Sequence, residues 1–299
     1  MWTTNDIPNQ TGKRVVITGS NTGIGFETAK ALYDKGAHVT LACRDIAKAN
    51  AASVKLTETP GPGKIEVAHL DLSSLKSIKA FTDRYRERSS VLDLLINNAG
   101  IMTPPHGFTA EGYELQFGVN FLGHFALTGE LYPLIRETRA SRIVTVTSLG
   151  YIHGNINFAN LRSEESYDAF REYCQSKLAN ILFTNELQRK IDTKGDQVLS
   201  LASHPGVTKT EISRHMSDQE LNDAIKLYGA LMETAQGALP TLYAAVSPEV
   251  EKGGFYGPDN DGGLRGYPTR NPVLEQALDE TIGKSLWNWA EQATNIVFP

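Results

Sequence analysis

Short apolar runs alternate with stretches of helical periodicity along most of the chain. Apolar strands that alternate with helices are typical of a parallel sheet covered on both faces. The pattern predicts one α/β domain with a doubly wound, mostly parallel, seven-stranded sheet and helices on both faces. The predicted strands are Arg14–Thr18, His38–Ala42, Ile65–His69, Leu92–Asn97, Arg142–Thr147, Val198–Ser203 and a short one near Gly254–Tyr256. The clearest helices are Glu27–Lys35, Ile46–Leu56, Leu75–Arg86, Gly112–Glu137 and Asp168–Ile191.

Three segments depart from this alternation. Leu149–Ser166 is polar, and residues 208–232 are charged and follow the sixth strand, where ligands bind in open α/β sheets. Each segment is either a wall of a substrate pocket or a mobile loop, and we favour a substrate lid for 208–232. The core is predicted to span residues 12–256. The extension 258–299 is expected to cover the substrate pocket, to pack on the core or to contact another subunit. Its apolar residues Leu274, Ala277, Leu278 and Ile282 fit an amphipathic helix, and Trp287 and Trp289 follow.

Composition narrows the class of protein. The chain has 299 residues, of which 40% are hydrophobic and 21% charged, as in an ordinary globular domain. Its net charge of −5 argues against a nucleic-acid or anionic-membrane partner. No apolar run reaches the ~18 residues of a membrane span, and the polar stretch Met1–Gln10 lacks a signal-peptide core. We therefore expect a cytoplasmic protein.

Cysteine and histidine usage favours neither a disulfide framework nor a metal site. The two cysteines are Cys43 and Cys174, and the seven histidines form no H-E-x-x-H or close-pair pattern. We expect Cys174 to be a small buried hydrophobe rather than a redox group. No metal is predicted.

A glycine-rich turn joins the first strand to the first helix, with the sequence Thr18-Gly19-Ser20-Asn21-Thr22-Gly23-Ile24-Gly25. Glycines at such a turn permit backbone conformations and close approaches that a Cβ would block. The helix N-terminus behind them offers free N–H groups and the positive end of a dipole to a pyrophosphate. The turn therefore predicts a dinucleotide site, with an ordinary glycine-rich turn as the alternative.

Tyr173 and Lys177 lie one turn apart on one face of a predicted helix. A phenol has a pKa of ~10, and a neighbouring ammonium is expected to lower it, which would make a proton donor and acceptor. Tyr and Lys at this spacing occur on many solvated helices. The preceding nucleotide-loop pattern is what makes the pair informative.

The glycine spacing resembles the T-G-x-x-x-G-x-G motif of the short-chain dehydrogenases/reductases. Asn97-Asn98-Ala99-Gly100 after the fourth strand and His204-Pro205-Gly206-Val207-Thr208 after the sixth are similar to two further motifs of that family. The closest resemblance is to its retinol-dehydrogenase-like branch, through Ala42–Asp45, Tyr173–Asn180 and the long gap between Ser148 and Tyr173. The resemblance implies a Rossmann fold and interconversion of alcohols with aldehydes or ketones, often on lipophilic substrates.

The family's catalytic tetrad falls on Asn120, Ser148, Tyr173 and Lys177. The resemblance implies that Tyr173 is the acid/base and that Lys177 lowers its pKa and bonds the nicotinamide ribose. Ser148, with Thr147 as its rival, would donate to the substrate oxygen, and Asn120 is either a relay towards Lys177 or a structural amide. The expected cofactor residues are Gly19, Asn21, Thr22, Gly23, Ile24, Gly25, Arg44, Asp71, Leu72, Asn98, Ala99, Gly100, Tyr173, Lys177, Pro205, Gly206, Val207 and Thr208.

Arg44 follows the second strand, where NAD-binding members usually place an acid. Its planar cation suits a 2′-phosphate, so NADP (NADPH) is favoured over NAD. Asp45 is expected to cap the helix that starts at Ile46. Asp71 either contacts the adenine or caps the helix that starts near Ser74.

These features predict an NADP(H)-dependent oxidoreductase acting on a small carbonyl or alcohol substrate. A non-catalytic NADP(H)-binding regulator is the first alternative, and a reductase of a conjugated C=C bond is the second. A sugar-nucleotide epimerase or dehydratase is disfavoured because no sizeable C-terminal substrate domain is evident. Family members often pair through the helices carrying Asn120 and Tyr173, so a homodimer or homotetramer is plausible.

Overall fold

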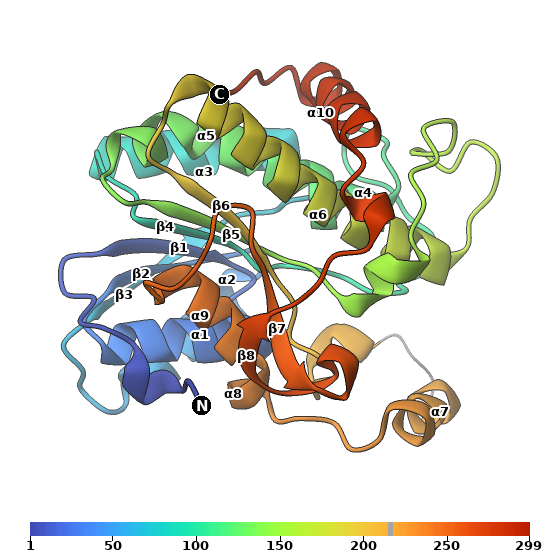
Figure 1. Ribbon diagram of the computed structural model, residues 1–299. Coiled ribbons are helices and arrows are strands. Elements are labelled where there is room, and N and C mark those ends of the chain that lie inside the picture. The colour runs from blue at the N-terminus through green and yellow to red at the C-terminus, as the bar shows by residue number, and fades with distance from the viewer. Residues whose placement is uncertain (215–217) are drawn as a thin grey trace.

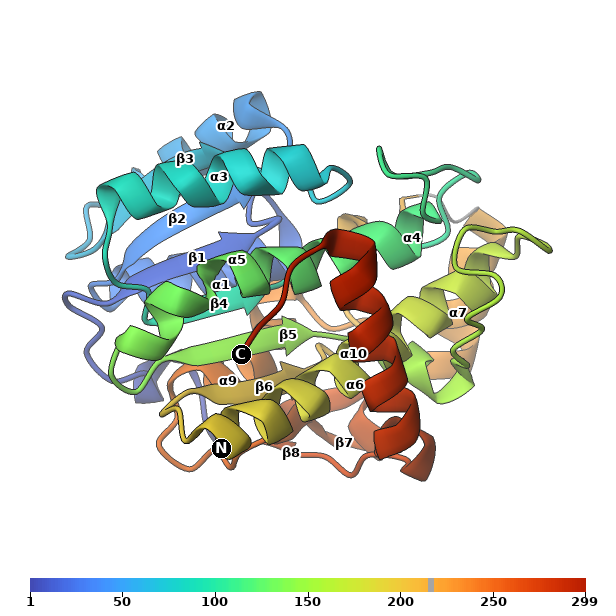
Figure 2. The same cartoon turned by 90° about the horizontal axis from the view of Figure 1, so that it is seen from above.

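The computed structural model describes residues 1–214 and 218–299. In that part of the chain an eight-stranded sheet has the order β3-β2-β1-β4-β5-β6-β7-β8, and the strands are parallel except for β8, which runs antiparallel to β7 (Figures 1 and 2). The chain reverses direction across the sheet between β1 and β4, which opens a crevice at the carboxyl ends of the strands. The strands are β1 Arg14–Thr18, β2 His38–Cys43, β3 Lys64–His69, β4 Leu94–Asn97, β5 Arg142–Val146, β6 Leu199–Ser203, β7 Phe255–Asn260 and β8 Arg265–Arg270.

Helices cover both faces of the sheet (Figure 1). One face carries α1 Gly23–Asp34, α2 Ile46–Thr57, α8 Thr234–Gly237 and α9 Leu239–Val246. The other carries α3 Leu75–Arg88, α5 Gly123–Glu137, α6 Ala169–Lys194 and α10 Glu280–Thr294. The short α4 Leu115–Phe117 runs through a π-helical turn, Gly118–Leu122, into α5, and α7 Asp218–Tyr228 projects beside the carboxyl ends of the strands. The fold is the predicted doubly wound Rossmann sheet.

Polar residues at predicted turns start the helices. Asp45 Oδ1 accepts the Lys48 N–H at 3.0 Å, so the expected cap of α2 is confirmed. Asp168 Oδ1 does the same for α6, accepting the Arg171 N–H at 2.7 Å. The helix that carries Tyr173 therefore starts at a defined residue, which sets the position of its first turns against the sheet.

Three details of the predicted elements were wrong. The sheet has eight strands rather than the predicted seven. The strand β8 was missed because it contains Gly266 and Pro268, which weaken strand signals but are tolerated at a sheet edge. The predicted helix 112–137 starts at Leu115 and is interrupted by the π-helical turn. The tail helix starts at Glu280, after Leu274 and Leu278, which are exposed.

The extension packs on the core through aromatic side chains of α10. Trp287 is 2% exposed and stacks on Phe183 of α6, with ring centroids 5.8 Å apart. Its ring also meets Phe125 of α5 edge-on at 5.0 Å. Cys43 and Cys174 are both buried free thiols, and burial of Cys174 was expected. No helix in the described ranges has the length and apolar character needed to cross a bilayer.

Candidate active site

The glycine turn and the segment after β4 interlock. Gly19 has a φ of +63°, and a Cβ on it would lie 2.9 Å from the Cα of Ala99. A Cβ on Gly25 would lie 2.5 Å from Asn98 Nδ2, which donates to the Thr18 carbonyl at 2.8 Å. The two predicted cofactor motifs are therefore brought together, and Asn98 braces the turn through its side chain.

The N-terminus of α1 is suited to a phosphate group. Thr22 precedes the first helical residue, Gly23, and within the described residues its side chain makes no capping hydrogen bond. The first N–H groups of the helix thus remain available to an anion. Asn21 and Thr22 are partly exposed beside them, whereas Ile24 is buried. A cradle of glycines behind uncapped N–H groups fits the pyrophosphate of a dinucleotide.

The predicted tetrad lies beyond the carboxyl ends of β4 and β5. A Cβ on Gly100 would lie 3.4 Å from Lys177 Nζ and 3.5 Å from Asn120 Oδ1. A Cβ on Gly150 would lie 3.3 Å from a ring carbon of Tyr173 and 3.5 Å from Ser148 Oγ. Lys177 Nζ is 5.7 Å from the centre of the Tyr173 ring. Residues from four separate segments thus converge on one space.

Burial dominates the titration of Tyr173 and Lys177. It raises the pKa of the Tyr173 phenol to about 12, against a smaller lowering effect of the Ser148 hydroxyl. Burial also lowers the pKa of the Lys177 ammonium to about 8. The Tyr173 pKa is thus raised rather than lowered, because burial disfavours the charged phenolate; the effect of Lys177 itself on this pKa stays a prediction. Tyr173 therefore keeps its proton at neutral pH.

The hydroxyl groups of Ser148 and of its alternative, Thr147, have different surroundings. The Thr147 side chain is buried, and its hydroxyl donates to the Lys177 carbonyl at 2.7 Å. Ser148 is partly exposed, and its Oγ accepts the Gly150 N–H at 3.1 Å. Because that bond leaves the Ser148 proton free to donate, Ser148 is the hydroxyl suited to a substrate oxygen.

Asn120 is held by the segment after β4. Its Oδ1 accepts the Ile101 N–H at 2.9 Å, and its Nδ2 donates to the Ile101 carbonyl at 3.0 Å. Nδ2 also donates to Ser176 Oγ, at 2.9 Å, one residue before Lys177. The amide is thus satisfied mainly by backbone, with one Oδ1 lone pair left beside Gly100.

The other predicted cofactor residues lie at the carboxyl ends of β2 and β3. Arg44 is exposed directly after β2, and Asp45 is occupied with the α2 cap. Asp71 follows β3 and accepts the Ser73 N–H at 2.9 Å, while Ser74 caps α3. The capping alternative for Asp71 was therefore wrong, and Leu72 beside it is buried. These residues line the sheet edge next to the glycine turn, as an adenosine site would require.

The segment after β6 forms the wall of the site opposite the residues that follow β2 and β3. Pro205, Gly206, Val207 and Thr208 are partly exposed, and the Thr208 hydroxyl donates to the Pro205 carbonyl at 2.9 Å. The two ends of the segment 208–232 are joined, because the Met232 N–H donates to Val207 O and the Lys209 N–H to Met232 O, both at 2.9 Å. Of this segment, 215–217 lie outside the described residues.

The first part of this segment lies over the crevice. A Cβ on Gly23 would lie 3.7 Å from Thr210, and one on Gly100 would lie 3.8 Å from Ile212. The segment thus spans both the phosphate end and the tetrad end of the site.

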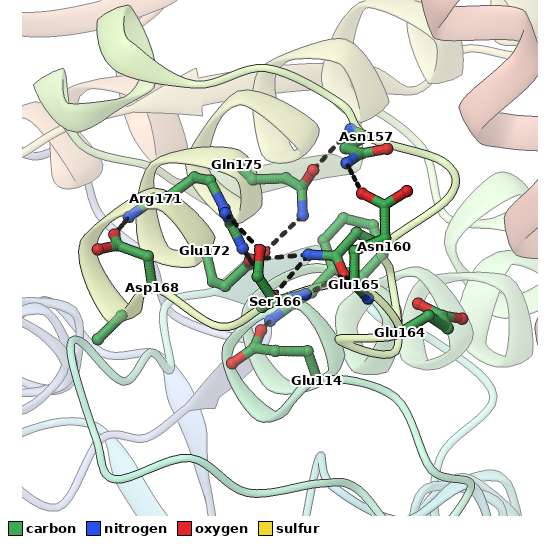
Figure 3. Close-up of polar contacts among 12 residues, drawn as sticks. Glu114, Asn157, Asn160, Glu164, Glu165, Ser166, Asp168, Arg171, Glu172 and Gln175 are labelled. Atoms are coloured by element: carbon green, nitrogen blue, oxygen red, sulfur yellow. Dashed lines mark hydrogen bonds and ion pairs between the residues drawn. The ribbon is translucent and has the colours of Figure 1, made fainter.

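The polar segment 149–166 is tied to the start of α6 (Figure 3). Gln175 Oε1 accepts the Asn157 N–H at 2.7 Å, and Gln175 Nε2 donates to the buried Glu172 at 2.8 Å. Asn160 Nδ2 donates to the Ser166 carbonyl at 2.8 Å. Glu172 and Gln175 flank Tyr173 on the helix, so the segment is anchored to the turn that carries the acid/base candidate.

Two buried histidines were missed as site residues by the sequence reasoning. His204 Nδ1 accepts the Gly206 N–H at 3.3 Å, and its Nε2 lies 3.1 Å from Asn271 Oδ1, which braces the turn after β6. His124 lies behind Asn120 and contacts Thr18. The available signal was His124 inside the apolar stripe formed with Phe117, Phe121 and Phe125, because a buried imidazole needs hydrogen-bond partners.

The fold and the site define a dinucleotide-dependent oxidoreductase. A sequence profile described as short chain dehydrogenase matches residues 13–221. The chain therefore belongs to the short-chain dehydrogenase family, which binds a nicotinamide dinucleotide.

Individual relatives confirm the resemblance to the retinol-dehydrogenase-like branch. Human retinol dehydrogenase 11 is 42% identical, over 93% of this chain and 84% of its own. Mouse retinol dehydrogenase 14 is 40% identical, over 96% of this chain and 87% of its own. A solved structure of an uncharacterised protein from Mycobacterium paratuberculosis is 38% identical and covers 100% of this chain and 99% of its own, with a TM-score of 0.83.

Proposed function

We propose that this protein is an NADP(H)-dependent reductase that converts an aldehyde or ketone to an alcohol, and the reverse. The observation that carries the proposal is the convergence of Ser148, Tyr173 and Lys177, in a fold that also presents an uncapped helix N-terminus behind a glycine turn. A bound nicotinamide would supply or accept the hydride at the carbonyl carbon.

The residues of the chain would manage the proton and the charge. Tyr173 gives its proton to the oxygen of the carbonyl group as that oxygen gains negative charge, and the high pKa of the phenol keeps the proton available at neutral pH. The Ser148 hydroxyl donates to the same oxygen and stabilises its charge. The Lys177 ammonium then favours the phenolate that remains on Tyr173. Asn120 would hold a water beside Lys177 through its unused Oδ1 lone pair. That water would return a proton to Tyr173 by way of Lys177.

The position of Arg44 favours NADP over NAD. Its guanidinium is exposed where β2 ends, while the only neighbouring acid in sequence, Asp45, is engaged in capping α2. A guanidinium can pair with a 2′-phosphate through two parallel hydrogen bonds.

Exposed apolar side chains on the segments that carry Ser148 and Tyr173 favour a lipophilic substrate. Ile152 is 42% exposed on the turn after Ser148, and Phe170 is 55% exposed one helical turn before Tyr173. Phe158, on the anchored segment, is 41% exposed. Retinol dehydrogenases among the relatives are named for a substrate of this kind.

The test is NADPH oxidation with aliphatic, aromatic, terpenoid, retinoid and steroid carbonyl compounds, with NADH in parallel. We expect turnover on at least one lipophilic member. In Tyr173→Phe, turnover should fall by roughly 10²-fold or more, because the proton donor is lost while the ring remains. NADPH binding, followed by nicotinamide fluorescence, should be retained. Near-normal turnover in Tyr173→Phe would refute the proton-donor role.

A further inference from the structure

His124 joins two parts of the site that are distant in sequence. It is 1% exposed, and its Nε2 lies 2.8 Å from Thr18 Oγ1 at the end of β1. Its Nδ1 lies 2.9 Å from the carbonyl of Asn120, in the π-helical turn. Neither of these two hydrogen bonds reaches a side chain that the proposed mechanism uses.

The hydrogen bonds determine which ring nitrogen carries the proton. Nδ1 faces a carbonyl oxygen, which can only accept, so Nδ1 must be the N–H. A neutral imidazole has one such proton, and burial together with the charge of Lys177 lowers the pKa of His124 to about 4, which keeps the ring neutral. Nε2 is therefore an acceptor.

The Thr18 hydroxyl completes the chain. It accepts the N–H groups of Asn98 and Ala99, each at 2.9 Å, and so uses both of its lone pairs. Its one proton points to His124 Nε2 at 2.8 Å, since the Ile96 carbonyl is more distant at 3.5 Å. One continuous chain of oriented bonds thus runs from the segment after β4 through Thr18 and His124 to Asn120.

We infer that His124 is a positioning residue that holds the Asn120–Lys177 side of the site in register with the glycine turn. Asn120 reaches Ser176, the neighbour of Lys177, through its side chain, and its backbone is fixed by His124. The same imidazole fixes the hydroxyl that anchors Asn98 and Ala99. The inference rests on the proposed reductase function, because it assigns the geometry of that site.

The test compares three substitutions with a matched control. His124→Phe keeps the ring and removes both bonds, His124→Asn keeps a donor near the Nδ1 position, and His124→Gln keeps an acceptor near the Nε2 position. Thr184→Val is the control, since it removes a buried hydroxyl that donates to the Asn180 carbonyl at 2.9 Å. We expect His124→Phe to lower kcat by roughly 10–100-fold with the carbonyl KM within about threefold, as misplacement of a reacting group would. His124→Asn and His124→Gln should each recover part of that loss, and Thr184→Val should retain the wild-type kcat.

Two results would overturn the inference. One is a kcat for His124→Phe equal to that of Thr184→Val. The other comes from ¹⁵N NMR of the wild-type imidazole, where we expect a neutral Nδ1–H tautomer from pH 5 to 8, and an Nε2–H tautomer or a titration in that range would contradict the bond chain. The NMR measurement uses the wild-type protein, so it depends neither on turnover nor on the folding of a variant. If the carbonyl panel fails but the tautomer is as expected, the proposed substrate class is at fault and the His124 geometry stands.

Discussion

Replacing Glu114 by Gln tests how the structure sets the pKa of a buried carboxyl group near the site. Glu114 is fully buried just before α4, and its oxygens accept the Gln116 N–H at 3.0 Å and the Phe117 N–H at 2.7 Å. Burial, and to a smaller extent the charge of Glu172, raises its pKa from 4.5 to about 7 despite those bonds. The folded protein therefore binds the Glu114 proton more tightly than the unfolded chain does.

This difference in proton affinity predicts a pH dependence of stability. The stabilisation is fully present below pH 4.5, falls as the pH rises, and is lost above pH 7, where both states are ionised. A shift of this size at ~1.4 kcal/mol per pKa unit corresponds to about 3 kcal/mol. Glu114→Gln does not titrate, so its free energy of unfolding relative to wild type should rise by about 3 kcal/mol between pH 4.5 and 8.

Urea denaturation at several pH values measures this change. Thr184→Val provides the control, because this substitution removes no titratable group. Its loss of stability relative to wild type should therefore be equal at every pH. A difference between Glu114→Gln and wild type that is independent of pH would refute the reasoning. An unchanged m-value would exclude a change in the unfolded state as the cause of an observed effect.

Two further predictions concern the cofactor and the C-terminal helix. In steady-state kinetics, Arg44→Ala should lower kcat/KM for NADPH by roughly 10–100-fold, because a charge-assisted hydrogen bond contributes about 1.5–3 kcal/mol. The kcat/KM for NADH should remain nearly unchanged. Equal losses with both cofactors would contradict a contact between Arg44 and the 2′-phosphate. Trp287→Ala should destabilise the fold by about 3–5 kcal/mol in denaturant titrations, because its buried ring packs on Phe125 and Phe183. Val297→Ala, at a side chain that is 82% exposed, should change stability by less than ~0.5 kcal/mol, and a similarly small effect of Trp287→Ala would show that α10 does not support the core.

Features that depend on neighbours in the chain were predictable from the sequence. The apolar runs located β1 to β6 to within two residues at each end, and Arg14–Thr18 matches β1 at both ends, whereas β7 runs four residues past the predicted Gly254–Tyr256. The cap of α2 at Asp45 followed in the same way, since a side chain three residues from an N–H decides it. The motifs around Gly19, Tyr173 and Lys177 indicated the family and the candidate chemistry, because each motif consists of residues only a few positions apart in the sequence.

Features that depend on contacts between distant residues required the tertiary structure. The bond from Thr18 to His124 joins residues 106 positions apart, and no local pattern contains it. The strand at Arg265–Arg270 forms by pairing with β7 despite its Gly and Pro. The rise in the Tyr173 pKa comes from burial, which the helical spacing of Tyr173 and Lys177 does not reveal. Local periodicity determined which residues form each element and carry the chemistry, whereas packing determined their partners, their protonation and their access to water.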